Sequence, residues 1–158
     1  MLYASLKALH FLSVIVWLGG MFFTLFCLRP GAAQLPPAER VPLMQAVLQR
    51  FFAIVLWVAL LTVLSGGWMV GRVATTTRAT GGPFNMPLEW SVMAGLGLLM
   101  VAIFGHIRFA LFKRVQRASA AQDWPAAGVA LKAIRDWVAV NLTIGVVIVV
   151  VVIAGTMT

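Results

Sequence analysis

Residues 6–28 read LKALHFLSVIVWLGGMFFTLFCL, an apolar stretch with Lys7 and His10 as its only basic residues. A helix of about 20 apolar residues is long enough to span the hydrocarbon core of a bilayer. The stretch is about twice as long as the apolar part of a signal peptide, and only one lysine lies at its start. We therefore predict that it stays in the membrane as a transmembrane helix.

The same apolar character extends over the whole chain. Of its 158 residues, 62% are hydrophobic and only 10% are charged, against roughly 25% charged residues in soluble domains. Further apolar windows cover about 48–70, 88–112 and 134–156. Barrel strands would alternate polar and apolar residues, and this pattern is missing. The sequence predicts an all-α fold, an integral membrane antiparallel four-helix bundle forming a single four-span domain over residues 1–158.

The basic residues predict the orientation in the membrane. The net charge is +8, and cytoplasmic loops carry the excess of Lys and Arg. Nine basic residues fall on one side of the four spans, against Lys7, Arg72 and Arg78 on the other; the nine are Arg29, Arg40, Arg50, Arg108, Lys113, Arg114, Arg117, Lys132 and Arg135. We expect a bacterial inner membrane protein with both termini in the periplasm. Short charge clusters between apolar runs favour the lipid bilayer as partner and exclude nucleic acid.

The connection between the third and fourth windows, about 113–133, is predicted as a basic cytoplasmic loop. Within it, Asp123 followed by Trp124 and Pro125 is typical of a helix start, with Asp as the N-cap and Pro in the first turn. We expect a short interfacial helix here, leading into the fourth span.

Two histidines lie inside the predicted spans, where ionisable groups are costly and mark functional sites. By helix rise, His10 and His106 each lie about 10 Å from the membrane midplane, on opposite sides and about 20 Å apart in depth. A single haem ligated by both is therefore disfavoured, and each histidine has its own candidate site.

The first candidate site surrounds His10. Methionines of the second and third spans are expected near its depth, two cations lie at the rim, and an indole shares its helix face; these residues are Met69, Met93, Lys7, Arg72 and Trp17. A haem b could take His10 and a methionine as axial ligands, with its propionates on the two cations. A soft Cu(I) site could use His10, Met69 and Met93. A structural alternative is that His10 bonds to a backbone carbonyl and the methionines fill core gaps.

The second candidate cluster combines His106 with Asn141 and Arg108 near the cytoplasmic side. A hydrogen bond between His106 and Asn141 would join two helices without any cofactor. Small residues on the His106 face, Gly95 and Ala102, would instead admit a flat ligand.

Several motifs in order resemble the copper resistance protein D (CopD) family. They are His10, Trp17 and Gly19-Gly20 with the exit Arg29-Pro30, then Arg50-Phe51-Phe52, SGGWM at 65–69, the third-span helix around Met93, Gly97 and Met100 with His106, QDWPAA at 122–127, and Ile134-Arg135 with Asn141-Leu142. The resemblance covers nearly the whole chain and implies a membrane protein linked to copper uptake or tolerance.

The first helix is also similar to that of the HemJ-type proteins, which bind haem b and carry a histidine followed seven residues later by tryptophan. His10 and Trp17 match this pattern. The Pro-Arg pair that those proteins carry late in the first helix is replaced by Leu25-Phe26, and their basic residue early in the third helix is absent around 93–95. These departures argue against porphyrinogen oxidation.

Three functions remain open from the sequence. The first is a haem b protein for membrane redox or electron transfer, a carrier or an oxidoreductase, exchanging electrons with a quinone or a periplasmic partner. The second is non-enzymatic copper binding or transport through a periplasm-facing His/Met site. The third is a structural or assembly subunit without a cofactor. Glycine-rich helix faces also favour a homodimer.

Overall fold

The computed structural model describes residues 1–155 of the chain, and within them every regular element is a helix. The elements are α1 (Leu2–Phe23), the π-helical η1 (Thr24–Leu28), α2 (Arg29–Ala32), α3 (Pro37–Ala79), α4 (Leu88–His106), the π-helical η2 (Ile107–Leu111), α5 (Phe112–Ala120) and α6 (Trp124–Gly155). They join into four continuous rods, each long and apolar enough to cross a membrane. The predicted all-α membrane fold is confirmed.

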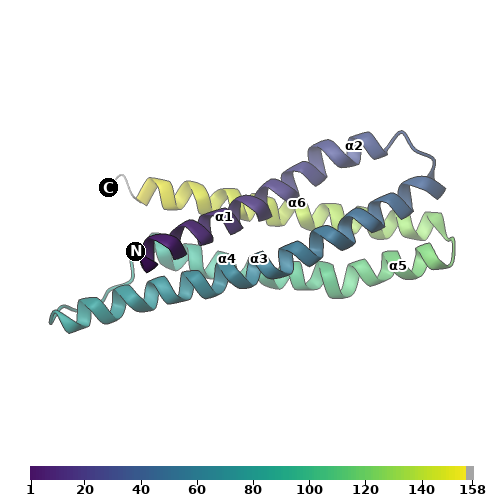
Figure 1. Ribbon diagram of the computed structural model, residues 1–158. Helices are drawn as coiled ribbons and strands as arrows, with labels where there is room; N and C mark the ends of the chain where they lie inside the picture. Colours follow the sequence, from purple (N-terminus) through teal and green to yellow (C-terminus); the bar gives the residue numbers. More distant parts are fainter. Residues whose placement is uncertain (156–158) are drawn as a thin grey trace.

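The rods form an antiparallel bundle (Figure 1). We call the end that holds Met1, the connection 80–87 and Gly155 the terminal end, and the end that holds the turns 33–36 and 121–123 the basic end. α1 packs along α3, and α4 with α5 packs along α6. The last turns of α3 project beyond the other rods at the terminal end (Figure 1).

The region 113–133 differs from the prediction. No separate short helix is present there, because α5 continues the third rod to Ala120 and α6 begins at Trp124 and runs without interruption into the fourth span. The start signal itself is confirmed, since Asp123 Oδ1 accepts a hydrogen bond from the Ala126 N–H at 3.0 Å. Once that cap has started a helix, nothing before the fourth span ends it, so the expected loop becomes a helical hairpin.

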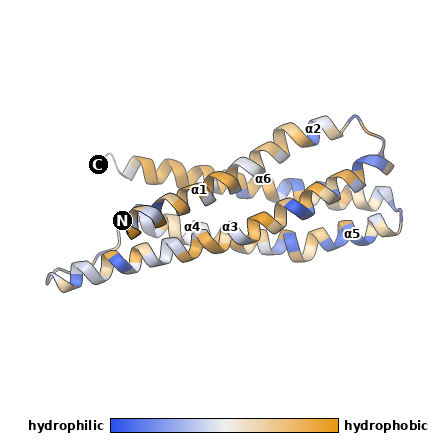
Figure 2. Cartoon of the chain, in the orientation of Figure 1, coloured by the Kyte–Doolittle hydropathy of each residue, from blue (hydrophilic) through white to orange (hydrophobic). Residues whose placement is uncertain are grey.

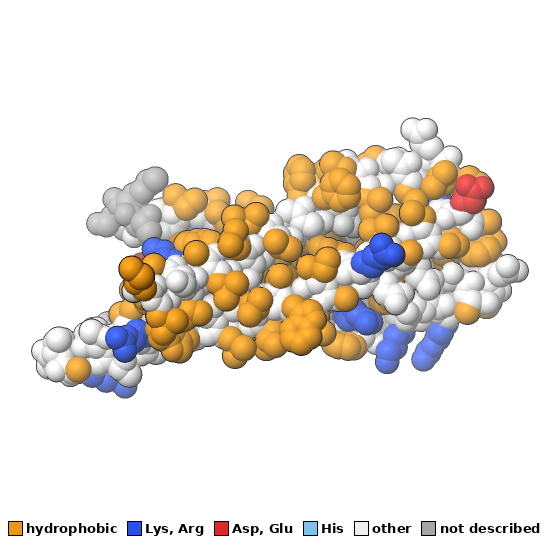
Figure 3. Space-filling view, in the orientation of Figure 1, with side chains coloured by type: hydrophobic (Ala, Val, Ile, Leu, Met, Phe, Trp, Pro, Cys, Tyr) orange, Lys and Arg blue, Asp and Glu red, His pale blue; other side chains and the backbone are white. Residues whose placement is uncertain are grey.

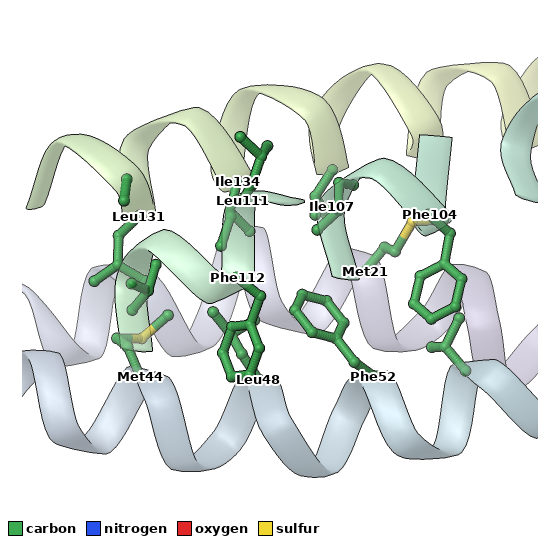
Figure 4. Packing of buried hydrophobic residues seen from close by; sticks show 14 of the residues in the cluster. Met21, Met44, Leu48, Phe52, Phe104, Ile107, Leu111, Phe112, Leu131 and Ile134 are labelled. Carbon is green, nitrogen blue, oxygen red and sulfur yellow. The ribbon is translucent and has the colours of Figure 1, made fainter. Parts of the chain in front are cut away.

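The buried apolar core occupies the half of the bundle toward the basic end. Its members fall within residues 17–32, 41–59, 100–115 and 127–138. Aromatic rings lie at its centre (Figure 4): Phe52 meets Phe104 and Phe112 edge-on, at 6.0 and 5.3 Å between ring centroids. Trp17 of α1 meets Phe104 in the same way at 6.1 Å. These contacts tie α1, α3 and α4 together at one level.

The outer surface is apolar as well. Apolar residues cover the middle of all four rods, and hydrophilic residues concentrate toward the ends (Figure 2). Large side chains such as Ile15 and Trp57 point outward, and lysines and arginines gather toward the two ends of the visible face (Figure 3). A surface of this kind requires lipid around it.

Candidate functional site

His10 projects from α1 onto α3. Its Nδ1 lies 3.0 Å from the backbone oxygen of Thr62 and 3.1 Å from Ser65 Oγ. The Ser65 hydroxyl donates to the carbonyl of Leu61 at 2.5 Å, so its oxygen is free to accept from the ring. A carbonyl oxygen can only accept a hydrogen bond. The hydrogen of the neutral ring is therefore assigned to Nδ1, which donates to Thr62.

This assignment leaves a lone pair on His10 Nε2. Within the described chain, Nε2 makes no hydrogen bond, and the imidazole as a whole is half-buried. Histidines that bind metals in proteins commonly donate the other ring N–H to a carbonyl or carboxylate, which fixes the tautomer and the ring orientation. The contact with α3 thus holds His10 in the form that can bind a metal ion.

Gly66 makes the approach of the ring possible. A Cβ added at Gly66 would lie 3.1 Å from His10 Cε1 and 3.5 Å from Nδ1, whereas a Cβ at Gly67 would meet nothing within 4 Å. The sequence placed Ser65 and Gly66 in the SGGWM motif but gave them no role at His10. The structure shows that Ser65 supplies a hydroxyl to the ring and that Gly66 supplies the space for it.

Met69 is the methionine that helix geometry directs toward His10. It lies half-buried one turn beyond Ser65 on α3. Helical side chains tilt toward the N-terminus of their own helix. Since α1 and α3 are antiparallel (Figure 1), His10 tilts toward the terminal end and Met69 tilts toward the basic end. Helix geometry therefore tilts the two side chains toward each other.

Met93 lies farther than Met69 from the level of His10 along the bundle axis. Trp17 contacts Phe104, and α1 and α4 run in the same direction (Figure 1). His10, seven residues before Trp17, is consequently level with Gly97. Met93 comes four residues earlier, about 6 Å closer to the terminal end. Its half-buried side chain would have to reach back to contribute to a site at His10.

The remaining members of the first cluster are spread out. Lys7 and Arg72 are exposed toward the terminal end. Trp17 is almost fully buried among the core aromatics, about 10 Å from His10 along α1. Trp17 thus packs in the core, about two helical turns along α1 from His10.

The second cluster does not come together. His106 is exposed and meets Trp137 edge-on at 5.6 Å between ring centroids. Asn141 is buried and directs its Nδ2 to the sulfur of Met21 at 3.8 Å, and the Arg108 guanidinium lies 5.6 Å from the centre of the Phe112 ring. The hydrogen bond between His106 and Asn141, one alternative for this cluster, is not formed, because Asn141 is buried in the core and His106 is exposed.

The described residues contain no group of three or more His, Cys, Asp or Glu side chains able to hold a metal ion. A site at His10 would consequently depend on one imidazole and on thioether sulfurs. Soft ligands of this type select Cu(I) over harder divalent ions.

The comparison with protein families gives one match. Residues 45–155 match the family described as CopD, copper resistance protein D. The matched segment includes Thr62, Ser65 and Gly66, which lie against His10 of α1, as well as Met69. It ends at the last residue of α6. No curated protein matches the chain, and no solved structure matches it.

Proposed function

Because the chain belongs to the copper resistance protein D family, we propose that it is a membrane protein that binds copper, with His10 Nε2 as the central ligand. The observation that carries the proposal is the pair of contacts from His10 Nδ1 to Thr62 and Ser65. These contacts occupy Nδ1 and leave an unprotonated Nε2 without a hydrogen bond from the described residues.

Cu(I) is the oxidation state that the available ligands favour. Met69 supplies the first thioether because helix geometry tilts its side chain toward His10 across the α1–α3 contact. Met93 of α4 supplies the second when α4 moves toward α1 or when its side chain extends toward the basic end. Imidazole and thioether ligands bind Cu(I) without the carboxylates that harder ions prefer.

The proposed site faces the periplasm of a bacterial inner membrane. Nine basic residues lie toward the basic end and three toward the terminal end, which supports a cytoplasmic basic end. His10 then lies in the periplasmic half of the bilayer. A periplasmic copper donor is the partner that this placement suits, and copper uptake or tolerance is the process it would serve.

Haem b is the competing ligand for the same imidazole. A histidine can bind haem iron through Nε2, and Lys7 and Arg72 at the rim could pair with propionates. The family match favours copper over haem. The two ligands are separated by the visible spectrum of the protein purified in a neutral detergent from haem-replete cells.

The test compares His10→Ala with His106→Ala, which removes the other histidine from an exposed position of the bundle. Anaerobic competition with a chromophoric Cu(I) chelator measures the affinity. We expect one Cu(I) per chain in the wild type, binding weakened at least about a hundredfold in His10→Ala through loss of the central ligand, and no change in His106→Ala.

Two outcomes would contradict copper binding at His10. One is equal Cu(I) affinity in the wild type and in His10→Ala. The other is an intense Soret band in the purified wild type that disappears in His10→Ala and persists in His106→Ala, which would assign the site to haem.

A further inference from the structure

A cavity of about 180 Å³ opens at the basic end, between α2, α3 and α6. Its polar lining comes from three cations on three different helices, Arg29, Arg40 and Lys132, and no acidic side chain lines it. Met44 and Leu131, both buried in the core, form part of its apolar lining. Three basic residues thus line a space that side chains do not fill.

Arg29 is held in place at this cavity. Its Nη2 donates a hydrogen bond to the backbone carbonyl of Leu131 on α6, so the guanidinium bridges from α2 to the opposite wall. A guanidinium carries five N–H donors. The bond to Leu131 uses one of them and fixes the direction of the others.

The charges of the cavity are balanced only in part, by Asp136, which acts electrostatically on Arg29 from outside the cavity lining. Within residues 1–155, the one ion pair joins Arg135 and Asp136, and neither of these residues lines the cavity. Three like charges around a small space repel one another unless an anion joins them. Membrane orientation alone would require basic residues at this end, but it would not require three of them to meet at one cavity.

We propose that this cavity binds a phosphate group, presented either by the headgroup of an anionic phospholipid or by phosphate in solution. Arginine guanidinium groups match phosphate oxygens with paired charge-assisted hydrogen bonds, and lysine adds a point charge. Basic pockets between transmembrane helices on the cytoplasmic side are typical sites for anionic headgroups. The proposal is independent of copper binding, because the cavity and His10 lie in opposite halves of the bundle.

Gly128 offers a way to fill the cavity without changing its charge. It lines the cavity, and a Cβ added there would meet nothing within 4 Å. A leucine at this position extends into open space and leaves the three cations in place. Gly128→Leu is therefore a steric test of the site.

The charge test uses Arg40→Gln/Lys132→Gln, which keeps the Arg29 bridge intact. Its matched control is Lys113→Gln/Arg117→Gln, which removes two exposed charges from α5 at the same end, away from the cavity. Purified proteins are mixed with phosphatidylglycerol or with phosphatidylcholine and examined by native mass spectrometry. Inorganic phosphate is tested separately by calorimetry. Thermal unfolding of each variant shows whether it is folded.

We expect the wild type and the α5 control to bind one phosphate-bearing ligand. Binding should weaken about tenfold or more in Arg40→Gln/Lys132→Gln, since charge-assisted hydrogen bonds are lost, and also in Gly128→Leu. Preference for phosphatidylglycerol over phosphatidylcholine assigns the ligand to lipid, and binding of inorganic phosphate alone assigns it to the solution. Equal binding of phosphatidylglycerol and of inorganic phosphate by the wild type and by folded Gly128→Leu and Arg40→Gln/Lys132→Gln would overturn the proposal.

Discussion

The two halves of the bundle differ in how their helices are held together. Toward the basic end, aromatic and aliphatic side chains from all four rods interlock, and Phe52, Phe112 and Val115 are almost completely buried. Toward the terminal end, beyond Ser13, the described chain has no buried apolar side chain, and Ser65 is buried beside His10.

If the proposed ligand binds at His10, this difference separates stability from ligand binding. Lipid chains are as apolar as leucine, so close packing and interhelical hydrogen bonds hold membrane helices together. The half with the interlocked core supplies that packing. The half with His10 lacks buried apolar side chains beyond Ser13 in the described chain, and binding regions belong to the less stable parts of proteins.

The largest effect is expected from Phe52→Ala in the packed half. Phe52 is 1% exposed and contacts Phe104 and Phe112, so its loss leaves a cavity and should lower the free energy of unfolding by about 3–5 kcal/mol. Trp57→Ala, on the same helix but 67% exposed, should cost less than about 1 kcal/mol. Reversible unfolding in mixed detergent micelles measures both. Equal losses would show that the aromatic cluster does not hold the rods together.

A smaller effect, confined to the ligand, is expected from Gly66→Ala in the open half. The new methyl group would lie 3.1 Å from His10 Cε1, so the ring would have to shift by a few tenths of an ångström against Thr62 and Ser65. Disturbing such supporting contacts should weaken Cu(I) binding about tenfold, or about 1.4 kcal/mol. Gly67→Ala is the matched control because its methyl group meets nothing, and its affinity should equal that of the wild type.

The unfolding free energy of both glycine variants should stay near that of the wild type, since neither position contacts the core. If Gly66→Ala binds Cu(I) as tightly as Gly67→Ala does, the contact with α3 does not position the ligand. Copper would then have to reach His10 in another ring orientation.

The sequence predicted the features that are determined within a single helix. The four spans follow from apolar length, the N-cap at Asp123 follows from its own turn, and His10 is conspicuous because ionisable groups are rare in apolar helices. The sequence offered a backbone carbonyl as one possible partner of His10, and the structure shows such a bond. That the carbonyl belongs to Thr62 could not be predicted, because every residue carries a backbone oxygen. Only the register of α1 against α3 brings it to the ring.

The sequence also does not predict how each helix is rotated about its own axis. A transmembrane helix is apolar on its lipid-facing side as well as on its buried side, so the pattern of polar residues that orients a soluble helix is missing. The sequence predicts that His106 and Asn141 both lie near the cytoplasmic side of the membrane. This depth does not show which way each side chain faces. The structure places Asn141 in the core and His106 outside it.

The smallest effect on the free energy of unfolding is therefore expected at Asn141, for which the sequence allowed a hydrogen bond to His106. Asn141 Oδ1 is buried and has no hydrogen-bond partner within the described chain, so Asn141→Leu removes an unsatisfied group along with a weak contact to Met21. Its effect on the free energy of unfolding should stay within about 1 kcal/mol. Combined with His106→Ala in a double-mutant cycle, the coupling should be below about 0.5 kcal/mol, since residues that share no contact act additively. A coupling of about 1–2 kcal/mol would mean that the two side chains bond to each other in the membrane. That result would require α4 to be rotated relative to α6, and with it the face that carries Met93, so the cycle also tests whether α4 can supply a ligand to the site at His10.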